Sequence, residues 1–448
     1  MEVKILSRKL IKPSSPTPEN FRNFQISFTD EMSPAMNVPL ILFYGGVFGG
    51  NGDDDKFITC KHTLETSLAQ ILPQFYPLCG RYIERDRLID CSDQGVEYLE
   101  AQVNYSLCHV QEAGIPAESL KPEELNHLLP CPFGAADEIT DPMLSIQVNA
   151  FECGGLAIGI CLSHRIADAA TLGTFVSAWA NACNPKAGQE QHIFPIFNSG
   201  QFFPSRNLPK LEMGIRRTMD DCPGPKILTR AFVFSGKAIS ELRSKCQQQQ
   251  HPPTRVQLVS GLILRALLAI DQAKCGHPRA SLVLQTVNFR KRTIPPIPEH
   301  SCGNFCLFAV AERTAEQNQS LDFQDCVNVV SDAVQKTIAD CKKILNPEAE
   351  VDGHMVVIDP FNYVIQTFAN RGNDLVPVSL NSWCRFPFYE ADFGWGKPFW
   401  VSVASLPVRN SVLMMDTRDG HGVEAWVNLD ENDMSRFLED RDILTYAV

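Results

Sequence analysis

The chain lacks the positive charge that binding to nucleic acid requires. Its 40 Lys and Arg residues are outnumbered by 52 Asp and Glu residues, and the formal net charge is −12 at pH 7. Proteins that bind nucleic acid usually present a basic surface, so we expect no nucleic-acid partner. An anionic ligand must therefore be met by a local group of basic residues, because the overall field repels it.

The N-terminal region also lacks an apolar run long enough for a signal sequence or a membrane span. Its first residues, MEVKILSRKLIKP, mix charged side chains with apolar ones. The apolar run VPLILFYGGVF (38–48) is far shorter than the ~20 residues that a membrane span needs. We therefore expect a chain without a membrane partner.

Cysteine pairs with CxxC spacing are missing as well, the nearest pair being Cys302 and Cys306. The chain has 16 cysteines, but none of them forms a CxxC pair. Zinc sites usually draw on two such close Cys or His pairs, so no metal is expected. Scattered single thiols are typical of reduced cysteines, which predicts a cytoplasmic protein rather than one held by disulfides.

Several common catalytic motifs are absent too. The chain has no GxSxG sequence, which disfavours a serine hydrolase with a nucleophile elbow. The stretch GGVFGGNGDDD (45–55) lacks both GxGxxG spacing and the Lys-Ser/Thr pair of a P-loop, and its three aspartates would repel phosphate. A DFG triplet is present at 392–394, but no HRD loop or VAIK-type lysine accompanies it, so a protein kinase is excluded.

The pattern that is present predicts a mixed α/β fold with large sheets in two halves. A length of 448 residues favours two domains. Between about 184 and 226 the periodic pattern gives way to Pro, Gly and polar residues. We therefore predict an N-terminal domain over 1–190, a crossover linker over 191–226 and a C-terminal domain over 227–448. The last hundred residues are expected to be mainly strand and turn.

The stretch GICLSHRIADAATL (159–172) is the first candidate site. An apolar run typical of a buried strand ends at Ser163, and His164 and Asp168 follow it. A histidine at a strand exit can take a proton at neutral pH, because its ordinary pKa is near 6.5. Asp168 reads as the N-cap of a helix over 168–184. On this spacing alone, a buried core histidine and a simple helix cap remain an alternative.

Two further segments carry unusual residues. In NSWCRFPFYEADFGWGKP (381–398), glycines alternate with aromatic residues around Asp392, which indicates a tight turn. In QTVNFRKR (285–292), a strand ends in three basic residues. These could contact phosphate or could simply be a solvated strand end. Arg290 could also pair with Asp168 and so hold the histidine loop in place.

Taken together, these motifs resemble those of the plant BAHD acyltransferases. HxxxD at 164–168 and DFGWG at 392–396 stand in that family's order. YPLCGR (76–81) is similar to its YPLAGR, QTVNFRKR to its QAVNLRxR, and Gly303-Asn304 to its GN pair. The opening KLIKPSSPTP and the segment around DFGWG resemble the alkaloid-acetylating branch in particular, and the resemblance spans essentially the whole chain.

The resemblance implies a fold and two substrates. The fold is α/β, with two similar-sized domains like chloramphenicol acetyltransferase, each a mixed sheet flanked by helices, and with a solvent channel between them. HxxxD lies in the N-terminal domain, and we expect DFGWG in the C-terminal one. Acyl-CoA and a small-molecule alcohol bind as substrates, with no bound cofactor, and the family is usually monomeric.

The resemblance also assigns roles to individual residues. His164 is the catalytic base, and Trp383 lies near the tetrahedral intermediate. Asp168 turns away from the channel and pairs with the arginine at 290. The structural loop, away from the histidine, contains Asp392, Gly394 and Gly396. Contacts to CoA are expected from Ser260 and Arg292, although Leu264-Arg265 departs from the Trp-Lys or Trp-Arg common in the family.

The expected reaction is acyl-CoA-dependent O-acylation of a plant specialised metabolite. The acyl group is short (acetyl, isobutyryl or isovaleryl), and the acceptor is an alkaloid, a terpenoid or a naphthoquinone such as shikonin. His164 would act as general base in a direct attack without an acyl-enzyme. Two alternatives are a catalytically idle relative that only binds a ligand, and an esterase or thioesterase that uses the same histidine with water.

Overall fold

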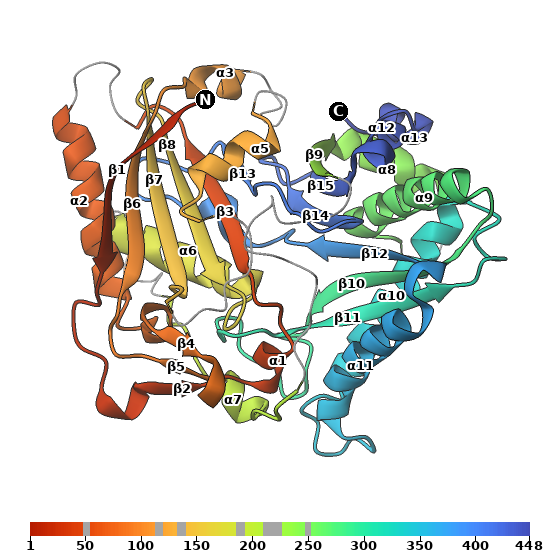
Figure 1. Ribbon diagram of the computed structural model, residues 1–448, viewed down its shortest axis with the longest axis horizontal. Helices are drawn as coiled ribbons and strands as arrows, with labels where there is room; N and C mark the ends of the chain where they lie inside the picture. The colour runs from red at the N-terminus through yellow and green to blue at the C-terminus, as the bar shows by residue number, and fades with distance from the viewer. Residues whose placement is uncertain (48–53, 113–119, 132–139, 185–192, 209–225, 247–251) are drawn as a thin grey trace. The chain divides into compact units, whose positions relative to one another are not determined.

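The chain forms two compact units, each built around a six-stranded mixed sheet (Figure 1). The computed structural model describes residues 1–47, 54–112, 120–131, 140–184, 193–208, 226–246 and 252–448. The first unit comprises Met1–Cys222, His300–Asn304 and Phe386–Ser405. The second comprises Pro223–Glu299, Phe305–Arg385 and Leu406–Val448. The α/β fold class is confirmed.

The sheet of the first unit has the strand order β1-β6-β7-β8-β3-β13. Only the β6–β7 pair is parallel; the other neighbours are antiparallel. A smaller antiparallel sheet has the order β2-β5-β4. The strands are β1 (Val3–Ile11), β2 (Asn23–Gln25), β3 (Asn37–Tyr44), β4 (Arg81–Ile83), β5 (Leu88–Asp90), β6 (Val96–Val103), β7 (Leu144–Phe151), β8 (Leu156–Ser163) and β13 (Trp400–Ser402).

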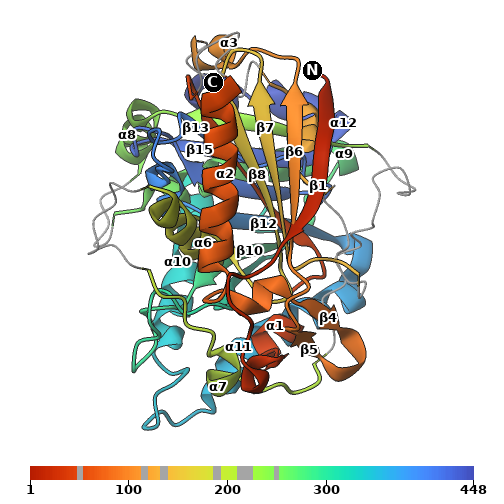
Figure 2. The same cartoon turned by 90° about the vertical axis from the view of Figure 1, so that its left-hand side faces the viewer.

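Two long helices pack together in the first unit, α2 (Asp54–Ile71) and α6 (Ala169–Cys183). The indole of Trp179 on α6 is fully buried and donates to the carbonyl of Leu64 on α2 at 3.2 Å. Figure 2 shows α2 running alongside the strands. The shorter helices are α1 (Phe28–Glu31), α3 (Leu107–Glu112), α5 (Pro122–Leu125) and α7 (Ser199–Phe202).

The segment that carries DFGWG belongs to the first unit, whereas we expected it in the C-terminal domain. After the motif, β13 pairs antiparallel with β3, and Trp400 faces Phe43 in the register. Their rings stack with centroids 4.7 Å apart. The expectation was wrong on this point because a pairing with a strand more than 350 residues earlier leaves no mark in the local sequence.

The sheet of the second unit has the order β11-β10-β12-β14-β15-β9. The central pairs β10–β12 and β12–β14 are parallel and the outer pairs antiparallel. The strands are β9 (Ile227–Phe234), β10 (Ala280–Asn288), β11 (Cys306–Arg313), β12 (Leu375–Ser382), β14 (Ser411–Asp416) and β15 (Val423–Asp430). The helices are α8 (Gly236–Lys245), α9 (Arg255–Cys275), α10 (Phe323–Cys341), α11 (Gly353–Arg371), α12 (Glu431–Leu438) and α13 (Arg441–Tyr446).

Helices cover both faces of this second sheet. On β10, Val283 packs into the cluster that holds α9 and α10, while Leu282 and Leu284 pack with Val364 of α11. Alternate residues of a strand point to opposite faces, so both faces are apolar. Helix α9 is long and apolar enough to cross a membrane, but 67% of that stretch is buried inside the protein. It reads as a core helix.

Two expectations about the second half need comment. The last hundred residues are mainly strand and turn, as expected, but they also hold the 19-residue helix α11, which the sequence analysis did not predict. The signal that was missed is Asp352, whose carboxylate caps the helix by accepting from the backbone N–H of His354. Most of the predicted linker (191–226) lies outside the described residues, so the domain boundaries stay predictions. The channel between the two domains stays a prediction as well.

Candidate active site

His164 stands directly at the exit of a buried strand. All eight residues of β8 are buried, and Ser163 at its end pairs with Asn37 of β3. The backbone N–H of His164 donates to the carbonyl of Met36 at 2.8 Å, which extends the strand pairing by one position. Taken with its backbone, the residue His164 is partly exposed. The sequence prediction of a histidine at the end of this strand is confirmed.

The imidazole of His164 is held by a residue far along the chain, Asn304. Its Nδ1 lies 2.9 Å from Oδ1 of Asn304, across 140 residues of sequence. The Asn304 side chain also donates from Nδ2 to the backbone carbonyl of His164 at 2.8 Å. Asn304 is 1% exposed, so the histidine is held at both its ring and its backbone by a buried amide.

A buried carboxylate fixes which way the Asn304 amide points. Oδ1 of Asp30 lies 2.8 Å from the side-chain Nδ2 of Asn304 and 3.0 Å from its backbone N. Because Nδ2 faces two acceptors, Asp30 and the carbonyl of His164, the amide oxygen must face the imidazole. An oxygen only accepts, so Nδ1 of His164 carries the proton and Nε2 keeps its lone pair. This tautomer is the one that a general base needs.

Burial lowers the pKa of His164 below its ordinary value of 6.5. Desolvation disfavours the charged imidazolium, while the nearby carboxylates of Asp168 and Asp30 oppose the shift. The net direction is downward, so the ring is neutral at pH 7. A neutral imidazole with a free Nε2 can accept a proton from a hydroxyl group.

Asp168 caps helix α6 and closes the turn behind the histidine. Its Oδ1 accepts from the backbone N–H of Thr171 at 2.9 Å, and the residue is 6% exposed. Its own backbone N donates to the carbonyl of Gly303 at 3.3 Å. The hydroxyl of Thr171 accepts from the backbone N of Gly303 at 3.1 Å. The predicted N-cap is confirmed, and the turn is tied to the residue beside Asn304.

The DFGWG motif forms a turn locked by its own aspartate. Oδ1 of Asp392 accepts from the backbone N of Gly394 at 2.8 Å and of Gly396 at 2.9 Å. Both glycines have positive φ, +107° and +103°. The ring of Phe393, 1% exposed, lies edge-on to Trp179 of α6 with centroids 5.0 Å apart. These contacts anchor the turn to the helix that Asp168 caps, and none of them involves His164.

Four predicted site residues belong to the second unit: Trp383, Ser260, Arg290 and Arg292. Trp383 follows β12, is partly buried, and donates its backbone N to the carbonyl of Met414 at 2.8 Å. Ser260 lies on α9, is fully buried, and points its hydroxyl at the sulfur of Met414 at 3.6 Å. This buried position does not support a contact between Ser260 and CoA.

The basic strand end divides into a buried and an exposed arginine. Arg290 is 5% exposed; its guanidinium lies over the ring of Phe305 at 4.5 Å, and its backbone N donates to Oδ1 of Asn288 at 3.0 Å. Arg292 is exposed and donates to the carbonyl of Asn288. A contact between Arg292 and CoA stays a prediction. So does the pairing of Arg290 with Asp168, because the two residues belong to different units.

Sequence reasoning missed the parts played by Asn304 and Asp30. Gly303-Asn304 was noticed only as a motif, because nothing local relates it to a histidine 140 residues earlier. Asp30 carried a readable signal: the spacing in Ser27-Phe28-Thr29-Asp30 is that of a capping box, and the structure contains one. The signal indicates a helix start, but it does not reveal what else the carboxylate contacts.

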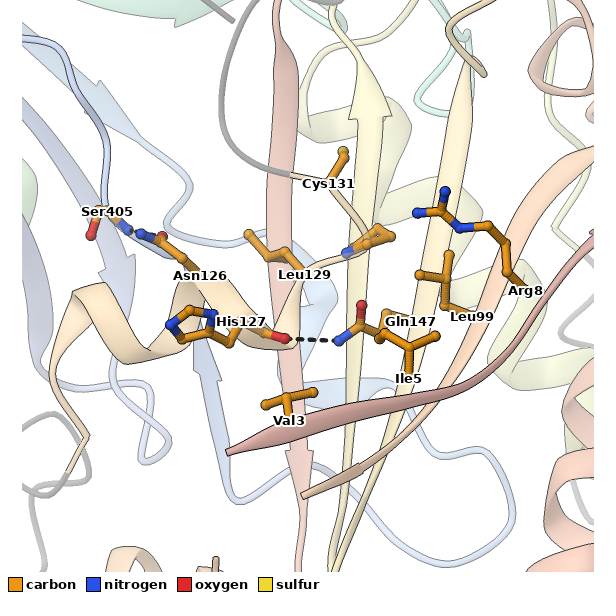
Figure 3. A pocket seen from close by; sticks show the side chains of 11 residues that line it. Val3, Ile5, Arg8, Leu99, Asn126, His127, Leu129, Cys131, Gln147 and Ser405 are labelled. Carbon is orange, nitrogen blue, oxygen red and sulfur yellow. Dashed lines mark hydrogen bonds between the residues drawn. The ribbon is translucent and has the colours of Figure 1, made fainter. Parts of the chain in front are cut away.

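A cavity of about 420 Å³ lies on the sheet of the first unit (Figure 3). The lining side chains come from β1, β6, β7, the segment 126–131 and Ser405. Gln147 donates from its side chain to the carbonyl of His127 at 2.9 Å, and it pairs in the sheet with Gly159, four residues before Ser163. No predicted site residue lines this cavity. In the described ranges, no group of three His, Cys, Asp or Glu residues could hold a metal ion.

The fold is that of the CoA acyltransferases of known structure. The crystal structure of vinorine synthase is similar to this chain with a TM-score of 0.79 and 31% identity, covering 99% of this chain and 98% of that one. The structure of F. graminearum TRI101 complexed with coenzyme A and T-2 mycotoxin has a TM-score of 0.71 over 95% of this chain and 99% of that one. At 16% identity, the second likeness concerns the fold alone.

The family follows from the sequence comparison. The profile of the Transferase family matches residues 1–444, and the chain belongs to this family, that of the plant BAHD acyltransferases. It is 33% identical to vinorine synthase of Rauvolfia serpentina over 97% of this chain and 96% of the relative. It is 34% identical to pelargonidin 3-O-(6-caffeoylglucoside) 5-O-(6-O-malonylglucoside) 4'''-malonyltransferase of Salvia splendens over 99% of both chains. The chain is therefore an acyltransferase.

Proposed function

We propose that the protein transfers a short acyl group from acyl-CoA to a hydroxyl group of a plant specialised metabolite. The observation that carries the proposal is the state of His164. The ring is held through Nδ1 by Asn304, is neutral at pH 7, and keeps Nε2 free. This is the arrangement of a general base, and it needs no second side chain as a nucleophile.

The reaction follows from this geometry in two steps. Nε2 of His164 accepts the proton of the acceptor hydroxyl while the oxygen attacks the thioester carbonyl, and a tetrahedral oxyanion forms. The C–S bond then breaks, the ester is released, and the imidazolium returns its proton to the CoA thiolate. The base contributes on the order of 10²–10⁴-fold in rate. A hydrogen-bond donor to the oxyanion, for which Trp383 is our candidate, contributes roughly 10² or more.

The substrate classes are supported by the relatives. Besides vinorine synthase, they include stemmadenine O-acetyltransferase of Catharanthus roseus, 32% identical over 98% of this chain, and limonoid 21-O-acetyltransferase of Melia azedarach, 31% identical over all of it. For this chain we propose acetyl-CoA as donor, with isobutyryl- and isovaleryl-CoA as further candidates. As acceptor we propose an apolar polycyclic alcohol: an alkaloid, a terpenoid or a naphthoquinone such as shikonin.

We further propose that the enzyme works in the cytoplasm as a monomer. No cysteine in the described ranges forms a disulfide bond, which supports a reducing compartment. Light scattering after size-exclusion chromatography would test the monomer, for which the mass is 49.9 kDa. A fluorescent fusion expressed in plant cells would test the location.

The test of the proposed function is a matrix of substrates. Purified protein is incubated with each acyl-CoA and each polycyclic alcohol, and free thiol and ester product are measured together. Ester and thiol appearing in equal amounts, only when the alcohol is present, is the expected result. Thiol release that ignores the alcohol would instead indicate thioester hydrolysis. Bound CoA without turnover by any pair would indicate an idle relative.

A further inference from the structure

The hydrogen bonds behind His164 form a series that ends at a buried carboxyl group, that of Asp30. Asp30 is 0% exposed, and both of its carboxylate oxygens accept hydrogen bonds. Oδ1 accepts from the backbone N and side-chain Nδ2 of Asn304 at 3.0 and 2.8 Å. Oδ2 accepts from the backbone N and hydroxyl of Ser27 at 2.9 and 2.6 Å, and from the hydroxyl of Ser199 at 3.3 Å.

The two oxygens of Asp30 therefore bind two different sets of partners. Oδ2 closes the capping box of α1, which a helix start of this kind uses for stability. Oδ1 is not needed for the cap, because it faces away from the helix toward Asn304, 274 residues later. Burial raises the pKa of Asp30, and the hydrogen bonds from Ser27 and Asn304 oppose this shift because they favour the charged form. A carboxylate buried at such a cost needs a reason beyond capping a four-residue helix.

We propose that Asp30 is a positioning residue for catalysis, which acts on His164 through the side-chain amide of Asn304. This inference rests on the proposed function, in which His164 is the base. The carboxylate holds Nδ2 of Asn304 and so keeps the amide oxygen on Nδ1 of His164. It also polarises the amide, which strengthens the hydrogen bond to the ring as the imidazolium forms. The arrangement does for this histidine what a directly bonded aspartate does in a Ser-His-Asp triad, with one amide interposed.

The charges that act on the ring set the direction of the expected effect. The carboxylates that raise the pKa of His164 are Asp168, from its own turn, and Asp30, from α1. Removing the charge of Asp30 therefore lowers the pKa of His164 further. The imidazolium that forms during the reaction also loses stabilisation, so kcat falls while the binding of acyl-CoA does not change.

The neighbouring carboxylate provides a matched control. Glu31 lies on the same short helix, is 3% exposed, and accepts from the backbone N of Leu208 at 3.0 Å and of Arg206 at 3.2 Å. Like Asp30, it is a buried, multiply bonded carboxylate of α1, but its partners are residues 205–208 and the guanidinium of Arg87, with which it forms an ion pair at 3.2 Å, and not Asn304. Glu31→Gln therefore disturbs the surroundings of α1 but leaves the hydrogen bonds from Asp30 through Asn304 to His164 in place.

The experiment compares Asp30→Asn with Glu31→Gln and with Asp30→Glu. For Asp30→Asn we expect kcat to fall about tenfold to a hundredfold with the KM for acyl-CoA unchanged, by analogy with the loss of the hydrogen-bond partner behind a metal-bound histidine. The acid limb of the kcat/KM profile shifts to lower pH. Asp30→Glu recovers part of kcat. Glu31→Gln keeps the wild-type kcat and acid limb even if its melting temperature drops.

A second measurement, of the protonation state of His164, uses the wild-type protein and needs no substitution of Asp30. In a ¹⁵N spectrum of protein with labelled histidine, the His164 signals are those missing from His164→Ala. We expect them to show a protonated Nδ1 and an unprotonated Nε2. A folded Asp30→Asn with unchanged kcat and acid limb, or a wild-type His164 protonated on Nε2, would overturn the proposal. Absence of ester product from the wild type would instead contradict the proposed function. The spectrum would still show whether Asp30 and Asn304 hold the proton on Nδ1 of His164.

Discussion

At the scale of single residues, the chemistry depends on how one imidazole is held. His164 is neutral because burial lowers its pKa, and it is oriented because Asn304 is itself fixed by two acceptors. Neither property is written in the HxxxD pattern. The pattern predicts a histidine at a strand exit and a helix cap. The orientation of the histidine ring depends on Asn304 and Asp30, which lie far from His164 in the sequence.

The pH dependence of the reaction tests the electrostatics of this residue. As pH falls, His164 takes up a proton and stops acting as a base, so kcat/KM falls. Because burial lowers its pKa, we expect this loss to be centred below pH 6.5. Below that pH the unfolded chain also binds a proton that the folded chain does not, so stability decreases in the same window as the pH is lowered. An acid limb of kcat/KM centred above 6.5 would contradict this assignment.

At the scale of elements, helix α6 links the two signature motifs. Its N-terminus is capped by Asp168, and Trp179 farther along packs against Phe393 of the DFGWG turn. The two motifs are thus two supports of one helix, although more than 220 residues separate them in sequence. The DFGWG segment therefore belongs to the same unit as His164, although none of its hydrogen bonds given above involves that residue.

Removal of the cap tests the first support. Asp168→Ala leaves the backbone N of Thr171 without its acceptor, and we expect a loss of about 1 kcal/mol in unfolding free energy, within a usual range of roughly 0.5–2. We also expect kcat to fall, because the turn that carries His164 loosens. Asp168→Asn keeps a capping oxygen and is expected to retain most of the stability. If the two variants are equally unstable in urea titrations, the lost interaction is a charge, as in the predicted pair with Arg290, and not the cap.

Strain at the glycines tests the second support. Gly394→Ala places a side chain where φ is +107°, a region that L residues avoid, and we expect a loss of about 1–3 kcal/mol in unfolding free energy. Gly173→Ala is the control: a Cβ there lies 3.5 Å from Pro387 in ordinary contact, inside helix α6. That change should be neutral or stabilising, because alanine favours helices. Thermal melts that rank the two variants in the opposite order would refute this account of the turn.

At the scale of the whole molecule, binding of a substrate should stabilise the fold. A ligand that binds only the folded state adds about 2.7 kcal/mol at a concentration 100-fold above its Kd. We therefore expect acetyl-CoA to raise the melting temperature of the wild type and of His164→Ala alike, since the base does not hold the donor. The same experiment with free adenine nucleotides shows how much of the effect comes from the nucleotide part. No shift at millimolar acetyl-CoA would count against a CoA site.

Much of this architecture could be predicted from local sequence, and the rest could not for a physical reason. Strand β8, the cap at Asp168 and the tight DFGWG turn follow from periodicity, side-chain capping and glycine. The amide of Asn304 and the pairing of β13 with β3 join segments that lie far apart in the chain. Such contacts are selected by the topology of the whole fold, and a local pattern carries no information about them.

The most direct test of the account is the turnover of His164→Ala with the acyl-CoA and alcohol that the wild type uses best. Thiol release and ester formation are measured at saturating substrates, with circular dichroism and the melting temperature as checks on folding. We predict a folded enzyme whose kcat for ester formation is reduced on the order of 10²–10⁴-fold. Ester formation at the wild-type rate by this variant would contradict the central claim that His164 is the base.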